Sequence, residues 1–289
     1  MPPAQSTAVS TAVLPTPLVS AVDAALDDVF ARAYNVDELL GPELSALKGP
    51  LDSVCKRHGL LIEKAIAAAL ASADHLEVMS QVSVPVGRAA LDLVRANTER
   101  VTRDVALPAG DAERSVILDV AVFDWMKRRL SLVSVKRGGG AQGGKAARDD
   151  RLELRAAAMV LRSLMTAQGF PVAEAEVVVV DWMGRSGIVT GTVLTRETID
   201  DHFGVAVAAT VEAMTARFAA GIAERMTDRL TLVARPPSSS DDDRDAASDR
   251  PPELDPPSLR DETLISFAEC LGALPRRGRG RQMTAVTAA

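Results

Sequence analysis

Two β-branched segments separated by a short polar stretch constrain the fold of this chain most strongly. Ser115 to Asp124 reads SVILDVAVFD and Leu130 to Lys136 reads LSLVSVK, with WMKRR between them. β-branched and aromatic residues at this density are typical of strands, and so short a connection favours an antiparallel hairpin. The chain should therefore contain a sheet built around these two strands.

The flanking segments predict an α/β fold. Apolar residues at helical spacing indicate helices at 18–34, 52–70 and 149–168, and a helix or pair of helices from 195 to about 229. Strand patterns occur at 78–86 and at 175–182, and the second is rich enough in valine to be buried on both faces. Residues 88–103 fit a further helix or a long excursion. We predict a central mixed β-sheet with an antiparallel hairpin, flanked by helices.

The hairpin register brings two charged residues together. If the chain turns between Met126 and Lys127, Asp119 faces Ser134 across the ladder and Lys136 stands one diagonal step further on the same face. The apolar residues of the first strand should then share the opposite face: Val116, Leu118, Val120 and Val122. A cross-strand salt bridge, which contributes about 0.2 to 1 kcal/mol, is the simplest explanation for such a pair.

The order of elements offers a functional explanation. A helix with Glu63, a strand, a strand with Asp119, a strand ending in Val135 and Lys136, then a helix and a strand together resemble the PD-(D/E)xK nuclease superfamily. The matching stretch is LDVAVFDWMKRRLSLVSVKRG, and the resemblance covers roughly residues 52–182. In that superfamily an aspartate is followed, through a hairpin, by Glu-x-Lys at the end of the next strand.

The resemblance implies a restriction-endonuclease-like fold and metal-dependent hydrolysis of DNA. Asp119 would be a ligand of Mg²⁺, or of Mn²⁺ in its place, Lys136 would offset developing charge, and Glu63 could add a ligand. A solvent-facing glutamate beside Lys64 is the alternative for Glu63. Three basic residues that follow the hairpin could contact the phosphate backbone: Arg137, Lys145 and Arg148.

Ser134 departs from the superfamily pattern, because it stands where the second acidic ligand is expected. The fold could have lost cleavage and become a nucleic-acid-binding or protein-binding module. Alternatively, the missing carboxylate comes from the following helix, as in some restriction enzymes with Ser-x-Lys. Asp150 is then the candidate ligand, with Glu153 a weaker substitute. Asp149 and Asp150 could equally be acidic residues in a first helical turn, where their negative charges interact favourably with the helix dipole.

Two rival sites are disfavoured. The loop GGAQGGK at 139–145 fits G-x-x-x-x-G-K, but Ala146 replaces the Ser or Thr that would hold Mg²⁺, and an antiparallel hairpin precedes the loop. We therefore expect no nucleotide cofactor. The three histidines show no zinc-type pairing, and no local motif suggests a hydrolase triad.

Composition divides the chain and limits its partners. We predict disorder at 1–18, the α/β domain at 19–235, an acidic Pro/Ser-rich linker at 236–262, a short helix at 263–274 and a basic tail at 275–289. A net charge of −6 excludes a global basic field, so DNA binding must be local or use the arginine-rich tail. Two unpaired cysteines and the lack of a signal-like or membrane-spanning stretch favour the cytoplasm. Oligomeric state is left open.

Overall fold

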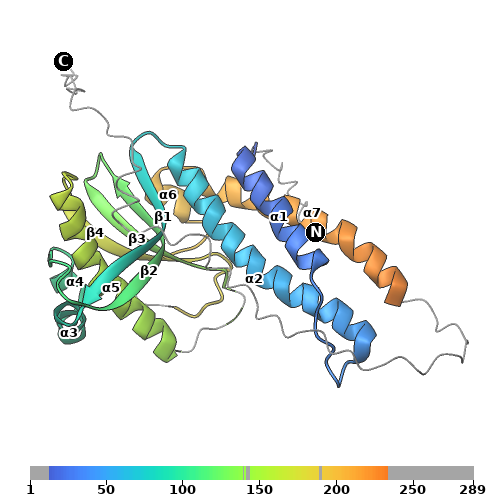
Figure 1. Cartoon of the computed structure of the whole chain (residues 1–289). Coiled ribbons are helices and arrows are strands. Elements are labelled where there is room, and N and C mark those ends of the chain that lie inside the picture. The colour runs from blue at the N-terminus through green and yellow to red at the C-terminus, as the bar shows by residue number, and fades with distance from the viewer. Residues whose placement is uncertain (1–12, 139, 141–143, 189–190, 234–289) are drawn as a thin grey trace, which may run out of the picture.

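The computed structural model describes residues 13–138, 140, 144–188 and 191–233 as a mixed β-sheet with helices on both faces (Figure 1). The strands are β1 (Leu76–Gly87), β2 (Ala112–Asp124), β3 (Arg129–Lys136), β4 (Glu174–Asp181) and β5 (Thr192–Leu194). The helices are α1 (Thr16–Ala31), α2 (Gly41–Ala71), α3 (Arg88–Ala96), α4 (Glu99–Thr102), α5 (Gly144–Ala167), α6 (Ile199–Phe203) and α7 (Val207–Val233). The predicted fold class, a mixed sheet flanked by helices, is confirmed.

The five strands lie in sequence order across the sheet, from β1 to β5. β2 is antiparallel to β1 and to β3, whereas β4 is parallel to both β3 and β5. The predicted hairpin is confirmed, because β2 and β3 pair from Asp124 with Arg129 to Val120 with Val133. A parallel pair needs a long crossover, and α5 supplies it between β3 and β4.

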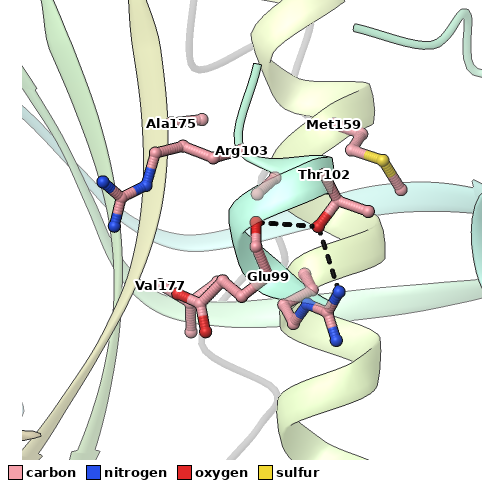
Figure 2. A pocket seen from close by; sticks show the side chains of 8 residues that line it. Glu99, Thr102, Arg103, Met159, Ala175 and Val177 are labelled. Carbon is pink, nitrogen blue, oxygen red and sulfur yellow. Dashed lines mark hydrogen bonds between the residues drawn. The ribbon is translucent and has the colours of Figure 1, made fainter. Parts of the chain in front are cut away.

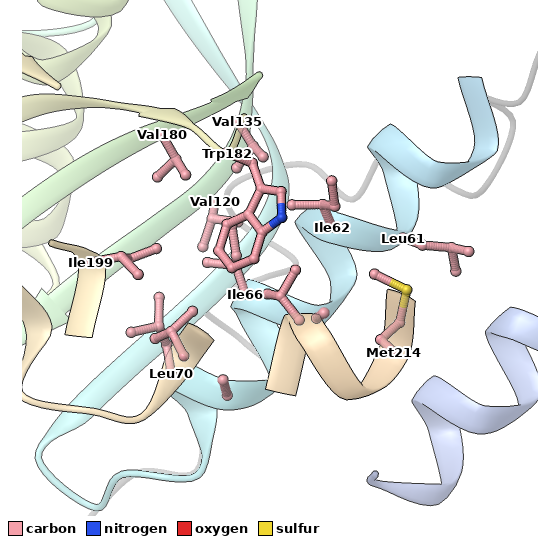
Figure 3. Packing of buried hydrophobic residues seen from close by; sticks show 14 of the residues in the cluster. Leu61, Ile62, Ile66, Leu70, Val120, Val135, Val180, Trp182, Ile199 and Met214 are labelled. Carbon is pink, nitrogen blue, oxygen red and sulfur yellow. The ribbon is translucent and has the colours of Figure 1, made fainter. Parts of the chain in front are cut away.

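Each face of the sheet is covered by its own apolar core. α1, α2, α6 and α7 pack on one face, against the side chains of Val120, Val133 and Val178 among others. Figure 3 shows part of this core, in which Ile62 and Ile66 of α2 face Trp182 and the strand valines, and Met214 of α7 belongs to the same cluster. α3 and α5 pack on the other face, against Leu118, Leu132 and Val177. Burial of β4 on both faces, expected from its valines, is confirmed.

The expected face alternation of β2 is wrong. Val116 and Leu118 pack in the core under α5, but Val120 and Val122 pack in the core under α2. Side chains two residues apart on a regular strand share a face, so the strand changes face near Asp119. β1 changes face at the same level, because Leu76 packs under α2 and Val82 under α5. The pairs Ser80 with Val120 and Val82 with Leu118 frame this irregular row of the sheet.

Several element boundaries differ from the predicted ones. α1 begins at Thr16, within the segment predicted to be disordered, and α2 begins at Gly41 and contains Pro50, although its helix was expected from residue 52. α5 begins at Gly144 rather than near 149. The three-residue strand β5 was not predicted. The predicted linker at 236–262, helix at 263–274 and tail at 275–289 lie outside the described residues, as do residues 1–12.

Candidate functional site

Asp119 lies where β2 and β3 diverge. After the pair Val120 and Val133, β2 continues toward its own start beside β1, whereas β3 continues to Lys136 beside β4. Asp119 Oδ2 accepts a hydrogen bond from the Val135 main-chain amide at 2.8 Å and one from Ser134 Oγ at 3.4 Å. A side-chain carboxylate thus takes the place of a strand carbonyl as acceptor. Asp119 is fixed in position by the strand that it faces.

Lys136 is the last residue of β3 and lies three residues beyond Val133, where the pairing with β2 ends. Its Nζ lies 3.4 Å from Asp150 Oδ2 on α5, and its side chain is half-buried. Burial raises the pKa of Asp119 and of Glu63, and the positive charge of Lys136 acts against this increase in both, so Lys136 lies within electrostatic reach of both carboxyl groups. The direct ion pair of Lys136 is with Asp150, and its link to Asp119 is electrostatic.

Glu63 reaches the same place from α2, on the other face of the sheet from α5. Its side chain is half-buried, whereas the neighbouring Lys64 is exposed. Burial is the main cause that raises the pKa of Glu63 to about 8, and the negative charge of Asp119 raises it further. Gln81 Nε2 donates a hydrogen bond to Glu63 Oε2 at 3.3 Å. The alternative of a glutamate that simply faces solvent does not describe this residue.

Burial also raises the pKa of Asp119 above its ordinary value. The hydrogen bond from Val135 and the charge of Lys136 act in the opposite direction, and the charge of Asp150 adds to the increase. Glu63 and Asp119, hereafter the carboxylate pair, are thus two desolvated acids held near each other with one half-buried lysine beside them. Two titratable acids whose pKa values are both raised mark a candidate functional site.

The carboxylate pair suits a divalent cation of the Mg²⁺ type in its chemistry. Mg²⁺ is bound through one or two carboxylates together with water and substrate phosphates, rather than by a complete protein cage. Within the ranges that the structure describes, no group of three or more His, Cys, Asp or Glu side chains is arranged to hold a metal ion. Among the described residues, a cation held by Glu63 and Asp119 would have no third His, Cys, Asp or Glu ligand.

Asp150 is held by Lys136 and does not join a three-carboxylate group. Because α5 begins at Gly144, Asp150 lies in its second turn, so the expected position in the first helical turn is wrong. Asp149 is exposed and forms a salt bridge with Lys145 at 2.7 Å, and Glu153 pairs with Arg114 of β2. A shallow depression beside Lys136 and Asp150 is lined by Ser134, Lys136, Ala147, Asp150, Arg151, Leu154, Val179 and Ile188.

The three predicted DNA-contacting residues occupy different environments. Lys145 and Arg148 are exposed on the first turns of α5. Arg137 follows β3 directly and is half-buried, and its Nε donates a hydrogen bond to His58 Nδ1 at 3.1 Å. His58 Nε2 lies 3.0 Å from Thr215 Oγ1 of α7. Burial, with the nearby charge of Arg137, lowers the pKa of His58 to about 4, so the ring is neutral and can accept this bond.

Two of the residues around this site were missed by sequence reasoning. In the sequence, His58 is only a histidine without a zinc-type partner. Its contacts could not be predicted, because Arg137 and Thr215 are separated from it by 79 and 157 residues along the chain. Gln81 gave no signal, since a glutamine in a strand is ordinary and its backbone conformation is set by the folded sheet. Neither residue has a sequence pattern that would have revealed its contacts.

A second depression lies away from the carboxylate pair, between α4, α5 and β4. Figure 2 shows it, lined by Glu99 and Thr102 of α4, the following Arg103, Met159 of α5, and Ala175 and Val177 of β4. The Arg155 guanidinium donates to Thr102 Oγ1 at 3.0 Å and to the Asn97 carbonyl at 2.8 Å. These bonds attach the α3 to α4 segment to α5, which gives the depression a structural role.

Comparison with family models, curated proteins and solved structures finds no match for this chain. Within the described part of the chain, no helix combines the length and the apolar character needed to cross a membrane. The glycine-rich loop at 139–145 is described only at residues 140, 144 and 145, so the arrangement of its amides lies largely outside the described residues. Function must therefore be argued from the carboxylate pair and its surroundings.

Proposed function

We propose that this protein is a metal-dependent nuclease that hydrolyses DNA phosphodiester bonds. The observation that carries the proposal is the carboxylate pair beside Lys136, at the divergence of β2 and β3. The order α2, β1, β2, β3, α5, β4 is also the order on which the resemblance to the PD-(D/E)xK superfamily rests.

The residues have distinct proposed roles. Glu63 and Asp119 would hold Mg²⁺ or Mn²⁺, which supplies Lewis-acid polarisation of the phosphate and an activated water. Lys136 carries a positive charge next to them and would stabilise the charge that develops on the phosphate oxygens. Asp150 keeps the ammonium of Lys136 in place through the 3.4 Å ion pair. Val135 and Ser134 orient Asp119 by their hydrogen bonds.

DNA would approach along the basic residues near this site. Arg137 follows Lys136 directly, and Lys145 and Arg148 lie on the exposed first turns of α5. The net charge of −6 makes general attraction to a polyanion weak, so these local charges would have to provide the phosphate contacts.

The test is cleavage of supercoiled plasmid and of single-stranded DNA by the full chain with Mg²⁺ or Mn²⁺. Asp119→Ala and Lys136→Ala should each lower the rate by a factor of about 10² or more, since each removes a charged group from the reacting centre. Lys127→Ala is the matched control, because Lys127 is exposed at the opposite end of the same hairpin. Cleavage that persists in both site variants would reject the assignment.

A binding module without cleavage is the second candidate, and Ser134 favours it because a hydroxyl stands where the superfamily has an acid. Folded protein that cuts neither substrate with either cation would support this candidate. A DNA-binding titration over a range of salt concentrations would then show whether nucleic acid is the partner, because phosphate contacts weaken as salt increases.

A further inference from the structure

Gln81 has an unusual backbone conformation for its position. Among the described residues, the only non-glycine residues with positive φ are Gln81, at 53°, and Arg128, at 55°. Arg128 lies in the tight turn between β2 and β3, where left-handed residues are common. Gln81 lies within β1, where the left-handed region costs free energy that a regular strand would avoid. The fold retains this conformation against that cost.

The left-handed conformation determines which face Gln81 reaches. Met79, two residues earlier, packs in the core under α5, and regular alternation would place Gln81 on that same face. Instead, Gln81 donates its side-chain amide to Glu63 of α2, on the other face of the sheet. The pairs on either side of Gln81 place it in the same row as Asp119. The irregular row thus brings Gln81, Asp119 and Glu63 together.

We propose that Gln81 is a positioning residue, which holds the Glu63 carboxyl group toward Asp119 so that the carboxylate pair can bind one divalent cation. This inference rests on the proposed function, because it assigns Gln81 a role in that same site. Groups that hydrogen-bond to metal ligands fix the orientation of those ligands, and their loss typically costs 10- to 100-fold in metal affinity or activity. The strained backbone of Gln81 is then the structural requirement for this contact.

The experiment compares Gln81→Gly with Arg128→Gly. Glycine adopts the left-handed region freely, so each substitution relieves the same kind of strain, but only the first removes a contact with Glu63. Mn²⁺ binding is measured directly by calorimetry on the full chain, together with the melting temperature without metal and the cleavage rate. We expect neither variant to melt below the wild type. Mn²⁺ affinity should fall about tenfold in Gln81→Gly and stay unchanged in Arg128→Gly.

A role in folding alone would give the opposite pattern. Gln81→Gly would then melt at a lower temperature and bind Mn²⁺ as the wild type does, which would overturn the inference. The same substitution in a Glu63→Gln background should cause no further loss of Mn²⁺ affinity. A loss that persists there would show that Gln81 does not act through Glu63.

The outcomes also separate this inference from the proposed function. If the wild type cuts no DNA but binds Mn²⁺ about tenfold more tightly than Gln81→Gly does, the role of Gln81 is supported and the nuclease is rejected. Cleavage and Mn²⁺ binding that are both unchanged in Gln81→Gly would reject the role of Gln81 and leave the nuclease standing. A wild type that binds no Mn²⁺ would overturn the positioning role and the metal-dependent function together.

Discussion

The Val135 main-chain amide donates to Asp119 Oδ2 at 2.8 Å, across the point where β2 and β3 diverge. This bond satisfies a buried strand amide with a side chain of the neighbouring strand, so Asp119 has a structural role besides any chemical one. An unsatisfied buried amide costs about 1 to 3 kcal/mol. Loss of the carboxylate should therefore be measurable in the stability of the protein.

Asp119→Ala should lower the free energy of unfolding by about 1 to 3 kcal/mol, because the Val135 amide loses its acceptor. Asp119→Asn should lose less, since an amide oxygen can still accept the bond. Urea denaturation of both variants at neutral pH measures the difference. Equal losses in the two variants would show that the charge, and not the acceptor, matters at this position.

The stability of the metal-free protein should fall as the pH rises toward the pKa of Glu63. The folded-state pKa of about 8 is above the ordinary value of 4.5 for a glutamate, so the folded state holds a proton that the unfolded state releases between these values. Stability attributable to Glu63 is full below about pH 4.5 and is lost as the pH rises through 8, by roughly 3 to 5 kcal/mol.

Glu63→Gln should therefore become more stable relative to the wild type as the pH increases from 5 to 9. Thermal and urea denaturation with a chelator present would measure this change. Glu224→Gln, an exposed substitution on α7, is the charge-matched control and should show no such trend. A constant difference between wild type and Glu63→Gln over this pH range would contradict the burial of the carboxyl group.

His58 should produce a pH dependence of the opposite sign. Its folded-state pKa of about 4 is below the ordinary value of 6.5 for a histidine, so the unfolded state binds the extra proton between these values. Stability is then full above about pH 6.5 and is lost as the pH falls through 4, by roughly 2 to 3 kcal/mol. In His58→Leu, the free energy of unfolding measured by urea denaturation should decrease less between pH 7 and pH 4 than it does in the wild type. An equal decrease in the two proteins would mean that other groups cause the loss of stability at acidic pH.

Asp150→Asn separates two roles that the sequence left open for this residue. As the partner of Lys136, Asp150 should affect the cleavage rate but not Mn²⁺ affinity, because the variant leaves the carboxylate pair intact. As a metal ligand, it should lower Mn²⁺ affinity at least tenfold. Calorimetry with Mn²⁺ and a plasmid cleavage assay on the same preparation would measure both effects. We expect the first result.

The hairpin and its register could be predicted because they depend on local information. β-branched residues mark β2 and β3, and the short turn between them determines which residues face each other, so the proximity of Asp119 and Ser134 followed directly. The resemblance proposes Glu63 and Lys136 as further residues of the same site. Their positions depend on an order of elements that periodicity reveals well.

The remaining features depend on contacts that periodicity does not encode. Proline is unfavourable inside a helix, yet Pro50 is buried within α2, and the helix begins at Gly41 rather than at residue 52. β5 is too short to show an alternating pattern. The change of face in β1 coincides with the positive φ of Gln81, and glutamine is not a residue that signals this conformation.

The irregular row through Gln81 and Asp119 divides the first two strands into halves with opposite side-chain parity. A single-residue deletion in β1 before this row would exchange the faces of its first half and leave Val82, Val84 and Val86 correctly buried. The two halves are thus independent in their hydrophobic patterning, although they share one set of main-chain hydrogen bonds. Mutational tolerance should accordingly change abruptly along each strand at this row. On a face of the sheet that is not fully covered, polar substitutions should be tolerated at even positions before the row and at odd positions after it, or the reverse.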